Sequence, residues 1–225
     1  MALYLGNSEK LKANFNNAAS RLVIPTLPLV PNGYTELDYI ETTGTQYIDT
    51  GFVPNQDTRV VCEFRVVTIT NLGGIYGARS SVANNDFSLR TSYTSAAGNR
   101  WQPCYNNEYG TFTDVPVDTT QWHIADQNKN TFYFDGVLRP TFTYAKFTAP
   151  RPVTIGAIKN NSSINYSKCR FRTFRIYDNG VTVRYFIPCK NPDGEVGMYD
   201  TVNDVFYSNA GTGEFLYGEL SSGNK

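Results

Sequence analysis

The sequence predicts an all-β protein built from two packed antiparallel sheets. Short runs alternate apolar and polar residues and stop at Gly, Asn or Asp, as strands do between turns. The chain has 16 Tyr and 14 Phe but only 2 Met, a balance that favours strands over helices. Such runs recur about every 8–15 residues with no helical stretch between them, which is typical of a β-sandwich.

Composition limits the possible partners. The 225 residues suffice for one large domain with a short appendage, and Lys plus Arg equals Asp plus Glu, so no excess charge favours nucleic acid or an anionic membrane. No apolar run approaches the roughly 18 residues of a membrane span. The opening MALYLGNSEK lacks the basic and apolar regions of a secretory signal. We expect no nucleic-acid partner and no membrane insertion.

Residues 1–33 differ from the rest and are predicted to form an N-terminal arm with a proline-containing linker. LYLGN resembles a short strand. In residues 8–22 one set of apolar residues alternates as in a strand and another has helical spacing, while the asparagines there favour the extended form. VIPTLPLVPNG then carries three prolines, which suit an extended connector. We expect the sandwich to occupy 34–220 and a tail to occupy 221–225.

The sandwich opens with an early strand inside YTELDYIETTGTQYIDTG, and clear alternation follows. In 59–67, Val60, Cys62 and Phe64 share one face while Glu63 lies on the other. Asp135-Gly136 and the Asn179-Gly180 pair supply hairpin turns, because these residues adopt positive φ at little cost. The same reasoning predicts strands at 73–78, 87–92, 121–127, 131–135, 153–158, 170–177 and 181–187.

The four cysteines show no zinc-ligand spacing. A three-residue loop at 178–180 would place Tyr177 opposite Val181, and that register, carried outward, sets Cys169 opposite Cys189. The pair could form a disulfide, but two reduced, buried thiols are the favoured interpretation in a chain without a secretion signal.

Three segments carry a family resemblance: YTELDYIETTGTQYIDTG, FRIYDNGVTVRYFIPCKNPDGEVGMYD and FYSNAGTGEF. Together they resemble the concanavalin A-like lectin/glucanase (laminin-G-like) domains of virion proteins from bacteriophages and prophages of gut Firmicutes. The resemblance covers Tyr34 to Gly218. It implies a jelly-roll-like β-sandwich on a particle surface, often with a glycan-binding role, but no particular ligand.

MALYLGNSEKLKANF separately resembles the N-terminal segments of phage structural proteins from the same hosts. We therefore interpret the chain as a virion surface protein: a capsid decoration, a head fibre or a tail-associated protein, assembled in the host cytoplasm. Its arm would bind other virion proteins, its sandwich would bind a host-surface or mucus glycan, and we expect a homo-oligomer of two or three copies. The alternative is a bacterial or prophage-encoded carbohydrate-binding adhesin.

The acidic motif Glu36-Leu37-Asp38-Tyr39-Ile40-Glu41 matches the E-x-D-x-x-E of glucanases with this fold. Retaining hydrolysis needs two carboxyl groups about 5–5.5 Å apart. Glu36 and Asp38 share a face of the strand, but Glu41 joins them only across a β-bulge. The motif also opens the domain instead of lining a mid-domain cleft, so we expect no enzyme. In the favoured interpretation Leu37 and Tyr39, with or without Ile40, pack inward.

A candidate sugar site lies in NRWQPCYNNEY, residues 99–109, which combines aromatic rings with planar hydrogen-bonding groups. A loop carrying Asn84 and Asn85 would adjoin it. In the alternative, Trp101 fills the core and the asparagines shape turns. The predicted ligand-binding residues are Arg79, Arg100, Trp101, Tyr105, Asn106 and Tyr109.

No metal or cofactor is expected. His123 is the only histidine and follows Trp122 in a strand-like run, where a packed side chain is the simplest interpretation. Asp193-Gly194-Glu195 and Asn203-Asp204 offer loop oxygens of the kind that calcium prefers, but loop carboxylates usually form turns.

Overall fold

The computed structural model describes residues 29–80, 85–95, 98–161 and 163–220. The expectations for LYLGN and for residues 8–22, and the predicted tail at 221–225, lie outside them. The start of the described chain packs on the sandwich, because Val30 is buried against Ile187, Cys189 and Tyr199.

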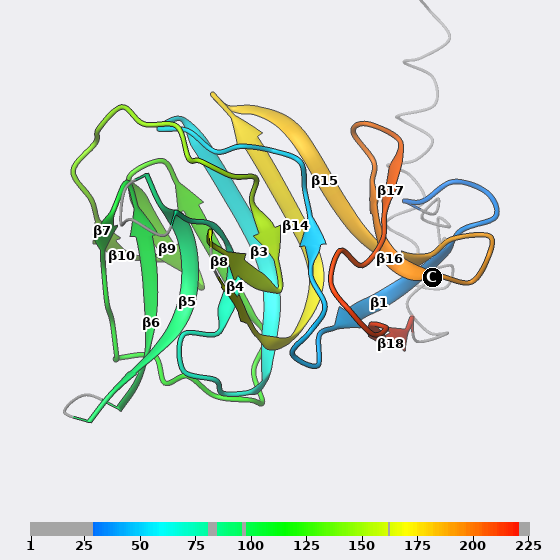
Figure 1. The fold of residues 1–225 in the computed structure, drawn as a ribbon, viewed down its shortest axis with the longest axis horizontal. Helices are drawn as coiled ribbons and strands as arrows, with labels where there is room; N and C mark the ends of the chain where they lie inside the picture. The colour runs from blue at the N-terminus through cyan, green and yellow to red at the C-terminus, as the bar shows by residue number, and fades with distance from the viewer. Residues whose placement is uncertain (1–28, 81–84, 96–97, 162, 221–225) are drawn as a thin grey trace, which may run out of the picture. The chain divides into compact units, whose positions relative to one another are not determined.

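The described residues form two β-sheets, which confirms the predicted all-β sandwich. The first sheet has ten strands, with β14 paired to β3 on one side and β15 on the other (Figure 1). Off the main order, β18 pairs with β1. In spatial order the strands are β10 (Val137–Thr141), β9 (Thr131–Phe134), β8 (His123–Asn128), β3 (Thr58–Thr68), β14 (Lys168–Asp178), β1 (Thr35–Glu41), β15 (Val181–Lys190), β16 (Val196–Asp200) and β17 (Val205–Tyr207), with β18 (Leu216–Glu219) beside β1.

The second sheet has eight strands, and its centre is the meander β4–β5–β6 (Figure 1). Pairing is antiparallel apart from one parallel contact between β12 and β4. In spatial order the strands are β13 (Ile164–Tyr166), β12 (Ala157–Lys159), β4 (Gly74–Ala78), β5 (Phe87–Thr94), β6 (Gly98–Tyr105) and β7 (Glu108–Tyr109), with β11 (Thr154–Ile155) joining β4 to β2 (Ile48–Asp49).

Alternation in the sequence builds the core between the sheets. Along β3 every second side chain is buried, as the pattern predicted. Phe64 from β3 meets Trp101 from β6 edge to face, with ring centroids 5.6 Å apart. Two polar side chains also bridge the layers: Tyr76 donates to Gln127 at 3.0 Å, and Gln127 donates to the carbonyl of Cys104 at 2.8 Å. These hydrogen bonds satisfy buried polar groups, which would destabilise the folded protein if they were left without partners.

Two strand predictions need correction. The run 153–158 is split into β11 and β12 by Gly156, whose φ is +86° and whose missing Cβ would lie 2.8 Å from Thr42 Cγ2. Only glycine fits there, so the strand breaks where the chain must bend. The second correction is β6, which covers most of the segment expected to form a binding surface of loops.

The β14–β15 hairpin has a two-residue turn, so the three-residue loop prediction is wrong. Asp178 pairs with Val181, and Asn179 and Gly180 both have positive φ. A bulge then shifts the register, and the strands separate so that β1 pairs with both. Cys169 therefore lies opposite Val66 on β3, and Cys189 opposite Glu36 on β1. Both thiols are free and buried, as the favoured interpretation expected.

β1 carries the acidic motif and a bulge. Leu37 and Ile40 are buried in the core, and the register against β18 shifts between Leu37 and Tyr39. The expectation that Tyr39 packs inward is wrong. Its ring lies 6.1 Å from that of Trp122 and beneath the guanidinium of Arg170, because the bulge turns it to the outer face.

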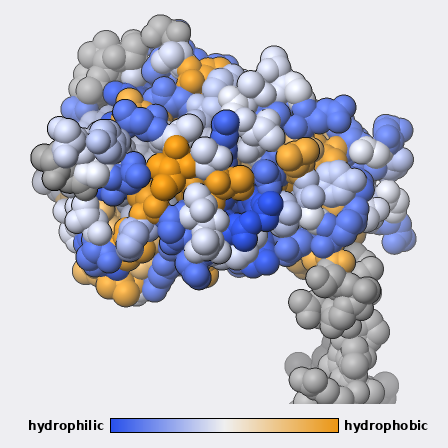
Figure 2. Space-filling model, turned by 90° about the horizontal axis from the view of Figure 1, so that it is seen from below, coloured by the Kyte–Doolittle hydropathy of each residue, from blue (hydrophilic) through white to orange (hydrophobic). Residues whose placement is uncertain are grey.

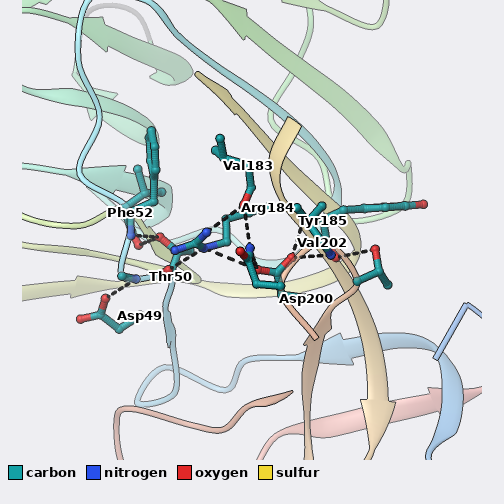
Figure 3. Close-up of polar contacts among 12 residues, drawn as sticks. Asp49, Thr50, Phe52, Val183, Arg184, Tyr185, Asp200 and Val202 are labelled. Atoms are coloured by element: carbon teal, nitrogen blue, oxygen red, sulfur yellow. Dashed lines mark hydrogen bonds and ion pairs between the residues drawn. The ribbon is translucent and has the colours of Figure 1, made fainter. Parts of the chain in front are cut away.

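A buried carboxylate fixes the end of the first sheet. Asp200 has no exposed surface and accepts hydrogen bonds from the backbone N–H groups of Tyr185 and Val202, at 2.9 and 3.1 Å. Arg184 lies 3.5 Å from the same carboxylate and donates to the carbonyls of Thr50 and Val183 (Figure 3). The charge is thus satisfied on all sides, and the β16–β17 turn is tied to β15.

The surface is mixed in character. Figure 2 shows apolar areas separated by hydrophilic side chains on the face seen from below. In the described part of the chain we find no helix with the length and apolar character needed to cross a bilayer.

Candidate ligand-binding site

The candidate site lies on the outer face of the second sheet, at the centre of the β4–β5–β6 meander. Phe87 and Leu89 of β5 enter the core, so alternation turns Ser88 and Arg90 outward. Even so, Arg90 is only 9% exposed. Arginine is rarely this buried without a charged partner, and this position therefore marks an unusual environment.

Arg90 has neutral partners. Its Nε donates to Gln102 Oε1 at 2.7 Å, directly across the β5–β6 pair, and its guanidinium carbon lies 4.9 Å from the ring centroid of Tyr109. Within the described residues no ion pair joins Arg90 to a carboxylate. Burial is the main cause that lowers the pKa of the Arg90 guanidinium, and the nearby charge of Arg79 lowers it further.

Asp86 is the carboxylate next to this arginine, and it is already engaged. It has no exposed surface, accepts a 2.7 Å hydrogen bond from the Tyr109 hydroxyl and another from Ser80 N–H at 3.1 Å. Arg79 Nε lies 3.1 Å from the same carboxylate. Burial raises the pKa of Asp86 despite these contacts, and burial likewise raises that of Tyr109.

Arg100 adds a third cation beside this group. It pairs with Ser92 across the ladder, one step from the Arg90–Gln102 pair and on the same face. Its Nε is buried without a hydrogen-bond partner in the described structure. The Arg90 cluster therefore contains three arginines and one aspartate, a local excess of positive charge. We define it as Arg79, Asp86, Arg90, Arg100, Gln102 and Tyr109.

The structure divides the predicted site residues into two groups. It brings Arg79 and Tyr109 together on Asp86. Arg100 lies further along the β5–β6 ladder, one pair beyond Arg90 and Gln102. Trp101 and Tyr105 have no exposed surface, because their positions on β6 face the core. Neither ring can serve as the exposed platform that the prediction required, which corrects that part of it.

The asparagines act as turn residues. Asn106 and Asn107 connect β6 to β7 with φ of +43° and +71°, values that asparagine adopts more readily than most residues. Asn85 likewise has positive φ, and Asn84 lies outside the described residues.

Sequence reasoning missed Asp86 and Arg90. The signal was present in Phe87-Ser-Leu-Arg-Thr-Ser92, where Arg90 stands between two serines on one face of a predicted strand. Arginine among small outward residues in mid-strand indicates a face that is not simply solvated. The pattern could not predict that the Tyr109 hydroxyl on β7 donates a hydrogen bond to Asp86.

The acidic motif is dispersed among separate partners. Glu36 accepts a hydrogen bond from Leu29 N–H at 3.1 Å, Arg172 binds Asp38 at 3.1 Å, and Arg170 binds Glu41 at 2.5 Å. The bulge that could align the three carboxylates does occur, yet each binds a different partner. Arg172 also binds Glu63, and its guanidinium carbon lies 3.9 Å from the centroid of the Trp122 ring. Arg65 on the same face also lies over Trp122, at 5.7 Å, and has no ion pair among the described residues.

The remaining chemical candidates form structural contacts. His123 is buried, with Nδ1 2.8 Å from Asp135. Asn191 accepts from the N–H groups of Asp193 and Glu195, and Asn203 donates to Asp200, so both suggested calcium loops form hydrogen-bonded turns. No group of three or more His, Cys, Asp or Glu side chains in the described ranges could hold a metal ion.

The chain was compared with protein families, curated proteins and solved structures. No family model and no curated protein sequence matches the chain. Among solved structures it is similar to a native heptameric SAP-like pentraxin from Limulus polyphemus (TM-score 0.48, 11% identity, 83% of this chain and 94% of that chain). It is also similar to domains LG4-5 of the mouse laminin alpha1 chain (TM-score 0.43, 18% identity, 66% of this chain and 44% of that chain). Similarities this distant carry no argument about ligand, assembly or biological setting.

Proposed function

We propose that the chain is a binding protein without catalytic activity, and that its sandwich binds a glycan at the Arg90 cluster. The observation that supports this most is Arg90 itself, which is nearly buried on an outer sheet face and has Gln102 and the Tyr109 ring as neutral partners. Keeping a cation in this position costs free energy, which a bound ligand would offset.

The chemistry of the cluster suits a sugar. Arg and Gln side chains are planar and form fixed pairs of hydrogen bonds, as recognition of hydroxyl and carboxyl groups requires. Adjacent strands hold these side chains in place, so they lose little conformational entropy when a ligand binds. The separate partners of Glu36, Asp38 and Glu41 support a binding role over hydrolysis.

For the biological setting we propose a bacteriophage virion surface protein, either a capsid decoration, a head fibre or a tail-associated protein. The three sandwich segments and the N-terminal segment that resemble such proteins support this. Residues 1–33 would join the protein to the particle, the sandwich would project to reach a host-surface or mucus glycan, and two or three copies would assemble. Several copies on one particle would strengthen weak individual contacts through avidity.

A glycan array tests the binding function. The full chain, labelled at an exposed lysine, is applied to an array of bacterial surface and mucin glycans, and hits are verified by titration up to millimolar sugar. We expect a limited set of related glycans to bind. No binding to any glycan at about 1 mM, an affinity of about 4 kcal/mol, would overturn the proposal.

A further inference from the structure

We infer that the ligand of the Arg90 cluster is an acidic glycan, whose carboxylate or sulfate group pairs with Arg90 and Arg100. This inference rests on the proposed glycan-binding function and specifies the class of sugar. It is supported by the balance of charge in the cluster, by the unused donors of its arginines, and by the contrast with Arg172 and Arg184, which have carboxylate partners.

The charge balance comes first. Asp86 is the one carboxylate of the cluster, and Arg79 and the Tyr109 hydroxyl already occupy it. The positive charges of Arg90 and Arg100 are left without a carboxylate among the described residues. A bound anion would supply the missing negative charge beside Arg90, which is nearly buried, and Arg100, which is partly buried.

The donors come second. A guanidinium has five N–H donors in a planar fork that matches the two oxygens of a carboxylate or sulfate. Within the described structure Arg90 uses Nε for Gln102, and Arg100 Nε has no partner. The terminal amino groups of Arg90 therefore remain for a ligand that approaches from the open side of the sheet.

Two arginines of the first sheet that lie beside acidic side chains show the contrast with Arg90. Arg184 has the buried carboxylate of Asp200, and Arg172 has both Asp38 and Glu63. Because the chain has zero formal net charge, no long-range field would attract polyanions in general. We therefore expect acidic glycans to bind through local contacts at the Arg90 cluster and not through the overall charge of the protein.

The experiment compares matched sugars and matched variants. Sialyllactose is titrated against lactose, and a sulfated N-acetyllactosamine against its unsulfated form, in about 150 mM salt, where charges beyond about 8 Å are screened. The proteins are the full wild-type chain, Arg90→Gln, Arg100→Gln and the control Arg175→Gln. Arg175 lies on the other sheet, with its guanidinium 3.8 Å from the ring centroid of Tyr185.

We expect at least one acidic sugar to bind about tenfold or more tightly than its neutral counterpart. The neutral sugar lacks the charged group, and a hydrogen bond to a charged group changes affinity by about this factor. Arg90→Gln and Arg100→Gln should each remove most of that preference, and Arg175→Gln should not. Arg100 is more exposed than Arg90, so its variant tests the site even if Arg90→Gln fails to fold. The two sugar pairs show whether carboxylate or sulfate is preferred.

Two results would overturn the inference in distinguishable ways. If neutral and acidic sugars bind equally well and the Arg90 and Arg100 variants change nothing, the acidic ligand is wrong while glycan binding stands. If acidic sugars are preferred but both variants retain the preference, the site is wrong. Absence of binding to every glycan on the array would overturn the proposed function as well.

Discussion

Neighbouring residues on β6 have opposite surroundings, and this decides which of them can meet a ligand. Trp101 faces the core, where its ring packs against Phe64 and Phe134 with centroids 5.6 and 4.9 Å away. Arg100, one residue earlier, is on the outer face beside the Arg90–Gln102 pair. Composition alone could identify this segment as unusual. It could not assign each aromatic ring to a face, because that depends on recognising the strand.

Separate substitutions of Trp101 and Arg100 should distinguish effects on stability from effects on glycan binding. Trp101→Phe leaves part of the core unfilled, so we expect it to lower the free energy of unfolding by about 1–3 kcal/mol and leave glycan affinity unchanged. Arg100→Gln should alter stability by no more than about 0.5 kcal/mol and weaken binding. Urea denaturation and sugar titration measure both quantities. A Trp101→Phe variant that loses binding as fully as Arg100→Gln would restore the aromatic-platform interpretation.

Asp86 should give the stability a pH dependence of defined sign. Burial raises its pKa in the folded state above the ordinary 3.8, so the folded protein takes up this proton more readily than the unfolded chain. The charged form therefore costs stability, and that cost falls as the pH drops through the folded pKa. We expect the wild type to gain stability relative to Asp86→Asn between about pH 7 and about pH 4.

Urea denaturation of both proteins across that pH range measures the difference. Other titrating groups are common to the two proteins and cancel. A wild type that loses stability relative to Asp86→Asn as the pH falls would show that the contacts from Tyr109 and Arg79 outweigh burial.

At the level of whole elements, the sequence predicts the positions of hairpin turns correctly but does not predict how the strands beyond them pair. Both predicted turns, at Asp135-Gly136 and Asn179-Gly180, have the positive φ values that were expected. The register of β14 against β15 failed because one bulge displaces everything beyond it. β6 was missed because its outward residues are polar, although Trp101 and Tyr105 alternate with them as in a strand.

The corrected register predicts four reduced thiols. Cys169 and Cys189 lie opposite residues on different strands, and burial raises the pKa of each to about 12. Native protein should therefore react very slowly with a thiol reagent, while denatured protein without reductant should show all four thiols. A count of two would demonstrate a disulfide and contradict the structure.

Asp200 should be essential to the end of the first sheet. Asp200→Ala leaves the N–H groups of Tyr185 and Val202 and the charge of Arg184 without their acceptor (Figure 3). Breaking a buried pair of this kind costs about 3–5 kcal/mol. Thermal denaturation measures the loss, and hydrogen exchange should show it first in β16 and β17. Asp204→Asn in the same turn is the control, with an expected change within about 0.5 kcal/mol.

For the molecule as a whole, the pattern of the sequence predicts the sandwich well because every strand must bury one face against the other sheet. The proposed binding function depends on residues of the outer face, which this burial rule does not predict. The Arg90 cluster depends on β4, β5, β6 and β7 meeting at one place, which no local pattern reveals. The predicted arm is a separate question, since only residues 29–33 of it are described, and these pack on the sandwich through Val30.

The boundary between arm and sandwich can therefore be placed more closely than the prolines allowed. Val30 is buried and Leu29 N–H donates to Glu36, so a deletion that removed them would damage the sandwich itself. Removing residues 1–28 should leave a folded protein with full glycan affinity that no longer incorporates into phage particles. Circular dichroism, sugar titration and immunoblots of purified particles measure the three properties. Normal incorporation of the shortened chain would contradict the anchoring role, and lost folding would place the boundary of the sandwich earlier in the sequence.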